Sequence, residues 1–286
     1  MNKPPPLPNL FVPGFAKSGT SHLCAVLAES PYIYLPKEKE PHYFADDLVP
    51  DSYRTDLASY QKFYSLSKAP YRLDGSVSYL YSNRAIARIV ASCESPRFLV
   101  MVRHPFDRML SHYRFNKRNG VETRPFTDAI RNANGLKKQW LYDYREMSDY
   151  PTQIDRLLSE VDGSAQVRLI DYSEYRSDPK AIIQRISNFL SVEIPTSDTL
   201  YRAINVSREP KFPSLNALLR VDTGWKKAVK KRVPFRLRRS IKKYVHNHNI
   251  TKNDIPVHLD SHAEHFKSEL DHAYLEFTSN YAKLYL

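Results

Sequence analysis

The segment from residue 10 to residue 28 places a short apolar stretch, a loop with two glycines and a helical pattern in direct succession. The glycines are Gly14 and Gly19, and hydroxyl residues follow the second one. This is the spacing of a P-loop, in which backbone N–H groups at the start of a helix cradle a phosphate. The pattern predicts an α/β fold whose first strand-to-helix turn binds an anion. An ordinary turn with an exposed lysine is the alternative.

The rest of the chain continues this alternation of strands and helices. Apolar runs predict strands at Leu10–Val12, Tyr32–Leu35, Tyr71–Leu73, Arg97–Val102 and Val167–Ile170. The fourth run is apolar from residue 98 to residue 102, as expected of a strand buried on both faces of a parallel sheet. Helical patterns cover Thr20–Ala28, Pro105 to about Lys117, the region near Leu136–Val161, and Pro179–Leu190.

These elements predict a P-loop-like α/β fold of three layers, with a central parallel sheet flanked by helices. We expect one domain over residues 1–286, with a core over about residues 9–192. The part from about residue 202 to residue 286 is expected to be helical and basic, without a clear strand.

Charge and cysteine content indicate the kind of partner and the cellular compartment. The formal net charge of +12 favours an anionic partner. Two cysteines, Cys24 and Cys93, cannot form a disulfide framework, and we expect buried thiols in a reducing cytoplasm. The N-terminus lacks the apolar core of a signal peptide, and no run approaches 18 apolar residues. We therefore expect a cytoplasmic protein without a transmembrane segment.

The glycine loop differs from that of P-loop kinases and ATPases. Those enzymes need a lysine directly after the second glycine, where this chain has Thr20, and its lysine is Lys17 inside the loop. They also need a carboxylate that helps to hold Mg²⁺, whereas the clearest strand ends in Arg103. The sequence therefore predicts a phosphate site without a metal. A small-molecule P-loop kinase is the second hypothesis.

Residues 16–21, Ala-Lys-Ser-Gly-Thr-Ser, resemble the 5′-phosphosulfate loop of sulfotransferases that use 3′-phosphoadenosine 5′-phosphosulfate (PAPS). The resemblance implies that this loop binds the donor, with the product 3′,5′-ADP left after transfer. It implies that Lys17 contacts the bridging oxygen of the leaving group. The implied donor-binding residues of the loop are Lys17, Ser18, Gly19, Thr20 and Ser21.

A second motif follows the clearest strand. Arg103 stands at its end, and Ser111 lies eight residues later in the predicted helix. A guanidinium can grip a phosphate with two hydrogen bonds, and a serine two helical turns further on can reach the same anion. The pair resembles the 3′-phosphate motif of the same family, which implies a donor with a 3′-phosphate. A surface arginine and an ordinary helix serine are the alternative.

The segment after the second strand carries the candidate base. Residues 37–44, Lys-Glu-Lys-Glu-Pro-His-Tyr-Phe, resemble the Glu-x-His-Phe-Phe segment of heparan sulfate sulfotransferases. The resemblance implies that Glu40 is the general base for a sugar hydroxyl. His42 either orients Glu40 or replaces it, because cytosolic members of the superfamily use a histidine base. A solvated loop in which Glu40 pairs with Lys37 or Lys39 is the alternative.

Other positions depart from the heparan pattern or carry weaker signals. Gly75 stands where the heparan enzymes have a second lysine, and Ser76 and Ser78 follow it as weaker donors or helix caps. Arg208 lies in a segment that resembles a nucleotide loop of bacterial members, and we assign it to donor binding. The tract Lys226–Lys243 is basic, and a protein that binds nucleic acid through it is the non-enzyme hypothesis.

We therefore expect a PAPS-dependent sulfotransferase that acts on a hydroxyl-bearing acceptor, a saccharide or glycoconjugate. The expected mechanism relies on positioning and electrostatics, with no metal and no nucleic-acid partner. Lys17, Glu40 and Arg103 follow the ends of the first, second and fourth predicted strands, where ligands of open α/β sheets bind.

Overall fold

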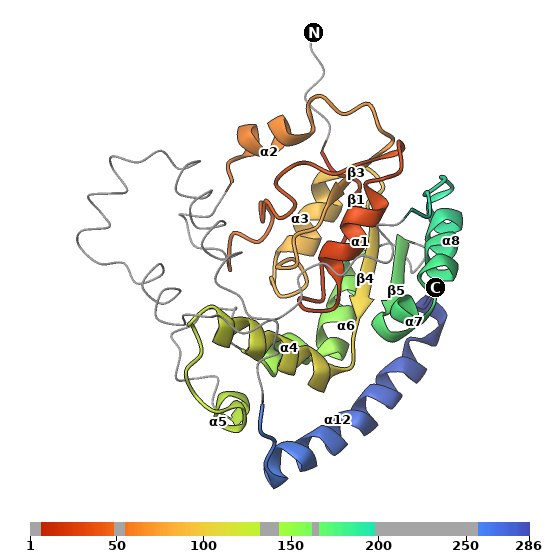
Figure 1. Cartoon of the computed structure of the whole chain (residues 1–286). Coiled ribbons are helices and arrows are strands. Elements are labelled where there is room, and N and C mark those ends of the chain that lie inside the picture. Colours follow the sequence, from red (N-terminus) through yellow and green to blue (C-terminus); the bar gives the residue numbers. More distant parts are fainter. Residues whose placement is uncertain (1–6, 49–54, 132–142, 162–165, 198–256) are drawn as a thin grey trace, which may run out of the picture.

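A parallel five-stranded sheet forms the centre of the molecule (Figure 1). The computed structural model describes residues 7–48, 55–131, 143–161, 166–197 and 257–286. The strand order is β2-β3-β1-β4-β5, and every pair is parallel. The strands are β1 (Leu10–Phe11), β2 (Ile33–Tyr34), β3 (Tyr71–Asp74), β4 (Arg97–Val102) and β5 (Val167–Asp171). Parallel strands place all their carboxyl ends at one edge of the sheet, which is where the site is built.

Helices connect the strands and cover both faces of the sheet. They are α1 (Thr20–Leu27), α2 (Leu57–Tyr64), α3 (Ala85–Ser92), α4 (Pro105–Arg118), α5 (Phe126–Arg131), α6 (Tyr150–Glu160), α7 (Tyr172–Ser177), α8 (Pro179–Leu190) and α12 (Ser261–Asn280). Two short 3₁₀ helices are η4 (Glu146–Ser148) and η7 (Ala282–Leu284). Aspartates at positions 56, 149, 171, 178 and 260 cap the starts of five helices by accepting backbone N–H bonds.

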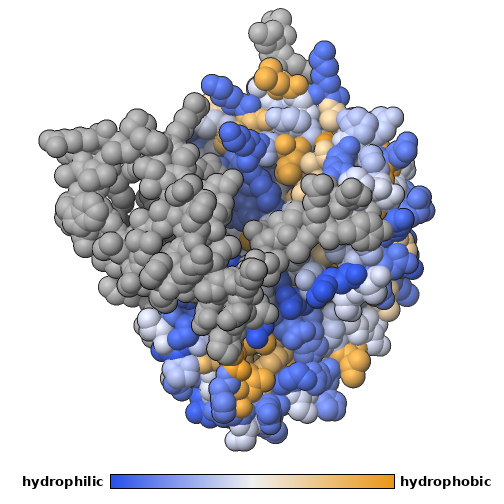
Figure 2. Space-filling view, in the orientation of Figure 1, coloured by the Kyte–Doolittle hydropathy of each residue, from blue (hydrophilic) through white to orange (hydrophobic). Residues whose placement is uncertain are grey.

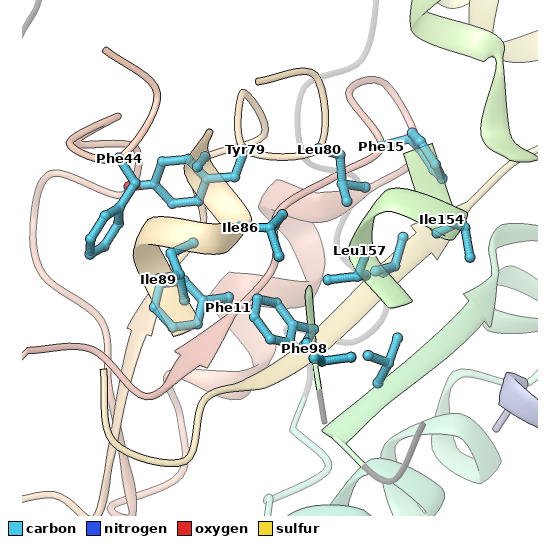
Figure 3. Packing of buried hydrophobic residues seen from close by; sticks show 14 of the residues in the cluster. Phe11, Phe15, Phe44, Tyr79, Leu80, Ile86, Ile89, Phe98, Ile154 and Leu157 are labelled. Atoms are coloured by element: carbon cyan, nitrogen blue, oxygen red, sulfur yellow. The ribbon is translucent and has the colours of Figure 1, made fainter. Parts of the chain in front are cut away.

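The alternation of side chains along β4 divides the core into two layers. Phe98, Val100 and Val102 point to the face covered by α3 and α6, and Figure 3 shows this packing around Phe11 and Phe98. Leu99 and Met101 point to the opposite face, where α1 and α8 pack. Both faces of the strand are therefore buried, which explains why its sequence is apolar without interruption.

The C-terminal helix α12 closes the molecule beside the ends of β4 and β5. The hydroxyl of Tyr274 donates to Oδ2 of Asp171 at 2.7 Å, and Nε2 of His104 lies 2.9 Å from Oδ1 of Asp271. The C-terminus then returns to the sheet, where the backbone N–H of Leu286 donates to the carbonyl of Leu169. On the face shown in Figure 2, hydrophilic side chains predominate among the described residues.

The three-layer fold with a parallel sheet is confirmed, and Cys24 and Cys93 are buried free thiols, as predicted. The helix predicted near Leu136–Val161 is wrong over its described first part. Residues 143–149 form a turn and a 3₁₀ helix there, because Asp149 and Pro151 begin a new helix, α6, at Tyr150. Arg208 and the tract Lys226–Lys243 lie outside the described residues. None of the described helices is both long enough and apolar enough to cross a membrane.

Candidate active site

The residues singled out by the sequence lie after the carboxyl ends of neighbouring strands. Lys17 follows β1, Glu40 follows β2, Gly75 follows β3 and Arg103 follows β4. Tyr172 directly follows β5 and begins α7. Because the strands are parallel, these five positions share one edge of the sheet.

Hydrogen bonds to the neighbouring strand hold the glycine loop. The backbone N–H of Phe15 donates to the carbonyl of Met101 at 2.9 Å, and the N–H of Met101 donates to the carbonyl of Gly14 at 3.0 Å. Gly19 begins α1 with φ 89°, and a Cβ there would lie 2.9 Å from the ring of Tyr172. Only glycine therefore satisfies both the backbone conformation and the space at this position.

The loop contains a buried polar atom that no described residue satisfies. Ser18 is fully buried, and its hydroxyl has no hydrogen-bond partner among the described residues. Leaving a buried hydroxyl without a partner is costly, so such an atom suits a site where a ligand supplies the partner. Thr20 is buried and Ser21 half-buried, both in the first turn of α1. This geometry fits an anion seated on the loop and the start of the helix.

Cations gather around Lys17. Burial lowers the pKa of Lys17 to about 8, and the nearby Arg118, Arg103 and Arg108 act in the same direction. Nη1 of Arg103 donates to the carbonyl of Lys17 at 3.2 Å. Nζ of Lys17 lies 4.3 Å from the centre of the Phe115 ring. Positive charges placed this close repel one another, so the arrangement is suited to a bound anion of high charge.

Arg103 also borders a pocket between the ends of β4 and β5. The pocket has a volume of about 460 Å³, and its walls include Arg103, Asp171, Tyr172, Arg176 and Tyr274. The guanidinium of Arg103 lies 4.8 Å from the centre of the Tyr172 ring, and its Nε has no hydrogen-bond partner among the described residues. The pocket thus combines unused hydrogen-bonding capacity with an aromatic face. Ser111 lies half-buried on α4, the helix that follows Arg103.

Glu40 lies in a row of polar side chains on the other side of the loop. Its Oε1 is 2.6 Å from Nζ of Lys39, and its Oε2 is 3.7 Å from Nε2 of His42. Nδ1 of His42 lies 2.8 Å from the hydroxyl of Ser78, and the backbone N–H of His42 donates to the hydroxyl of Ser76. Burial lowers the pKa of His42 below its ordinary value. This row can hold a carboxylate in one orientation and accept a proton from a neighbouring hydroxyl.

A buried carboxylate fixes the segment that supports His42. Asp74 is fully buried at the end of β3 and accepts hydrogen bonds from the hydroxyls of Tyr60 and Tyr79, both at 2.8 Å. It also accepts the backbone N–H of Ser76 at 2.9 Å. Burial raises the pKa of Asp74, and the hydrogen bonds oppose this effect. Asp74 therefore holds the turn that presents Ser76 and Ser78 to His42.

A sequence comparison decides the family. The model described as "Sulfotransferase family" matches residues 54–196, which is half of the chain. This chain belongs to the sulfotransferase family. The matched segment includes Arg103 and Ser111 and begins after Lys17, Glu40 and His42.

Individual sulfotransferases are similar to the chain over longer segments. Two human proteins, heparan sulfate glucosamine 3-O-sulfotransferases 3B1 and 3A1, are each 26% identical over 196 residues. These segments cover 65% of this chain, and 47% and 45% of the human proteins, so the chain spans about half the length of these relatives. A sulfotransferase crystal structure from Alicyclobacillus acidocaldarius superposes with a TM-score of 0.63 at 27% identity, covering 69% of this chain and 86% of that one. The family and fold that the motifs predict are confirmed.

The fold brings some of the predicted site residues together and adds others. Arg103 contacts Lys17 directly, and Glu40 lies close enough to influence the charge of Lys17. The sequence motifs did not point to Arg118 beside Lys17 or to Tyr172 beside Arg103. Tyr172 could have been predicted as a site residue, because it is an aromatic residue directly after the last strand. Arg118 could not, because its position depends on the path of α4. Within the described residues, no group of three or more His, Cys, Asp or Glu side chains is placed to hold a metal ion.

Proposed function

We propose that this sulfotransferase transfers a sulfuryl group from PAPS to an acceptor hydroxyl on a saccharide. The observation that carries the proposal is the arrangement along one edge of the sheet. A cationic loop built around Lys17 and Arg103 lies beside a row in which Glu40 contacts Lys39 and His42. Sulfuryl transfer needs these two functions side by side, one for an anionic donor and one for a proton.

The donor side has the chemistry that PAPS requires. We assign the 5′-phosphosulfate to the loop from Lys17 to Ser21, where Ser18 offers a buried hydroxyl without a described partner. We assign the 3′-phosphate to Arg103 and Ser111, and the nucleoside to the pocket that contains Tyr172. When bound, PAPS supplies an activated sulfuryl group and a phosphate leaving group. Lys17 is placed to stabilise charge on that phosphate. Arg208 remains a further candidate for donor binding.

The acceptor side supplies the base. Glu40 takes the proton of the acceptor hydroxyl as the new sulfur–oxygen bond forms, which is general base catalysis. His42 orients Glu40, because its other ring nitrogen is held by Ser78 and burial disfavours its charged form. His42 and Lys17 both have left-handed backbone conformations, with φ 56° and 73°, which non-glycine residues rarely adopt. Such conformations are concentrated at functional sites.

The saccharide acceptor is supported by the relatives. The two human relatives are named for heparan sulfate glucosamine. Gly75 replaces a lysine of the heparan pattern, so we propose a saccharide of a different kind from heparan sulfate. The two buried thiols support a cytoplasmic location.

The proposal is tested by incubating the protein with PAPS labelled in the sulfuryl group and a panel of hydroxylated saccharides. We expect label in a saccharide product, an equal amount of 3′,5′-ADP, and no loss of rate in EDTA. Mass spectrometry identifies the product and the position modified. Turnover that EDTA abolishes and Mg²⁺ restores, with ATP as the donor, would support the kinase hypothesis instead.

A further inference from the structure

Lys39 takes a path that one glycine makes possible. A Cβ on Gly75 would lie 2.9 Å from Cε of Lys39 and 2.9 Å from Sγ of Cys24. The backbone N–H of Gly75 also donates to the carbonyl of Lys39 at 3.0 Å. Any larger residue at position 75 would therefore displace the lysine stem or the cysteine. The end of β3 holds Lys39 by its backbone and leaves a channel for its side chain.

The ammonium of Lys39 contacts the candidate base, Glu40. Nζ of Lys39 lies 2.6 Å from Oε1 of Glu40, and the two side chains are 20% and 31% exposed. Burial opposes the charge on Lys39, but the neighbouring Cys24, Glu40 and Asp74 outweigh it and raise its pKa above the ordinary value. Lys39 therefore stays charged, and its partner is the carboxylate proposed to take the proton.

Glu40 needs a cation of its own. An anionic donor on the glycine loop brings negative charge towards Glu40, and negative charge nearby favours a protonated carboxyl that cannot act as a base. Other described charged groups also influence this region. Arg103, Arg108 and Arg118 lie around Lys17 on the donor side, and Glu38 adds further negative charge near His42. Lys17 belongs to the donor loop, and His42 is disfavoured in its charged form by burial. Asp74 and Cys24 also lie close enough to influence Lys39, and neither supplies positive charge. Lys39 is the cation left to balance Glu40.

We propose that Lys39 is a positioning residue that keeps Glu40 ionised and oriented beside the anionic donor, and that position 75 is glycine so that Lys39 can reach it. This inference rests on the proposed role of Glu40. In the transfer step, the acceptor oxygen bonds to sulfur while its proton passes to Glu40. The sulfur–oxygen bond to the donor phosphate breaks, and its electron pair stays on the phosphate oxygen. Lys39 remains protonated throughout and acts only through Glu40.

The test follows the titration of Glu40 in the free protein by NMR. Glutamate is labelled with ¹³C at the side-chain carboxyl, and the Glu40 signal is assigned by its loss in Glu40→Gln. Removing a cation this close favours the protonated carboxyl, so the titration midpoint should move to higher pH in Lys39→Met. The matched variant Lys39→Arg keeps the charge and should titrate close to the wild-type protein. An unchanged midpoint in Lys39→Met would overturn the proposal.

A second variant covers the case in which Lys39→Met does not fold. Gly75→Ala keeps Lys39 but places a methyl group against its flexible end, so the Glu40 midpoint should move upward by a smaller amount. Thermal unfolding verifies that each variant is folded. A Gly75→Ala protein that is folded and titrates like the wild type would show that the lysine needs no channel, against the proposal.

Kinetics separate this inference from the proposed function. With an acceptor in hand, Lys39→Met should move the acid limb of the kcat profile to higher pH and leave the KM for PAPS nearly constant. If Glu40→Gln is as active as the wild type, the proposed base is wrong, and the role of Lys39 falls with it whatever the NMR shows. If Glu40→Gln is inactive but the titration midpoint of Glu40 is unchanged in Lys39→Met, only the role of Lys39 is overturned.

Discussion

The donor side and the acceptor side of the site are held by different kinds of interaction. On the donor side, backbone hydrogen bonds between the loop at Gly14–Phe15 and Met101 of β4 fix the geometry, and Arg103 binds the carbonyl of Lys17. On the acceptor side, side chains fix one another, from Lys39 through Glu40 to His42 and Ser78. A backbone-held loop can be the same in many proteins, whereas a side-chain row is specific to its chain. We infer that the donor site is the general part and the acceptor site the part adapted to one substrate.

The largest expected effect separates chemistry from binding. Glu40→Gln removes the base but keeps its shape, so kcat should fall by about 10²–10⁴-fold while the affinity for 3′,5′-ADP stays nearly constant. His42→Ala should cost less if His42 only orients Glu40. Steady-state kinetics and calorimetry on both variants check this. An active Glu40→Gln with an inactive His42→Ala would move the base to His42.

The next effect lies on the donor side. Arg103→Ala removes a guanidinium from the proposed 3′-phosphate position, and charge-assisted hydrogen bonds of this kind contribute about 1.5–3 kcal/mol. Affinity for 3′,5′-ADP should therefore fall by about 10–100-fold, and affinity for 5′-AMP should fall by clearly less, because Arg103 also holds the carbonyl of Lys17 in the loop assigned to the 5′-phosphate. Calorimetry with both nucleotides measures the two values, and Arg131→Ala, at an exposed arginine on α5, is the control. A loss of the same size for both nucleotides would argue against a role at the 3′-phosphate.

A smaller effect should appear as a dependence on pH. Burial and three arginines lower the pKa of Lys17 to about 8, so the free protein loses this charge as the pH rises through that value. A bound anion favours the charged form, so nucleotide binding at pH 8 should take up about half a proton. Affinity should then weaken by up to about tenfold for each further pH unit.

Calorimetry in two buffers of different ionisation enthalpy measures this uptake. Lys17→Met should bind weakly and take up no proton. Uptake of the same size in Lys17→Met would assign the titration to another group.

The smallest effect concerns Ser111. A single neutral hydroxyl contributes about 0.5–1.5 kcal/mol, so Ser111→Ala should weaken 3′,5′-ADP binding by about 3–10-fold and leave 5′-AMP binding unchanged. Competition between the two nucleotides for the wild-type and variant proteins resolves a difference of this size. A Ser111→Ala protein indistinguishable from the wild type would leave the 3′-phosphate position to Arg103 alone.

The fold was predictable where one strong local signal decides an element. The continuous apolar run of β4 and the Asp178-Pro179 start of α8 appear in the structure at the predicted bounds. The helix predicted near Leu136–Val161 is present only as α6 among the described residues, because apolar spacing alone does not reveal the capped start at Asp149. Helix α7 has only six residues, which is too short for a periodic pattern.

The same division applies to the site. Lys17 and Arg103 were predictable as neighbours because each follows a strand, and β1 pairs with β4. From the sequence, Glu40 could pair with either Lys37 or Lys39. In the structure it pairs with Lys39, whose side chain occupies the space next to Gly75. The packing of β3, α1 and the segment after β2 creates this space. Tertiary packing of this kind cannot be predicted from a local sequence pattern.

The central claim is that the donor side is built for a nucleotide with both a 5′- and a 3′-phosphate. Calorimetric titration of the unmodified protein with 3′,5′-ADP and with 5′-AMP, at one salt concentration and pH 7, tests it most directly. We expect 3′,5′-ADP to bind at least about tenfold more tightly, because Arg103 and Ser111 are assigned to the 3′-phosphate. Equal affinities for the two nucleotides would show that the donor site does not recognise a 3′-phosphate.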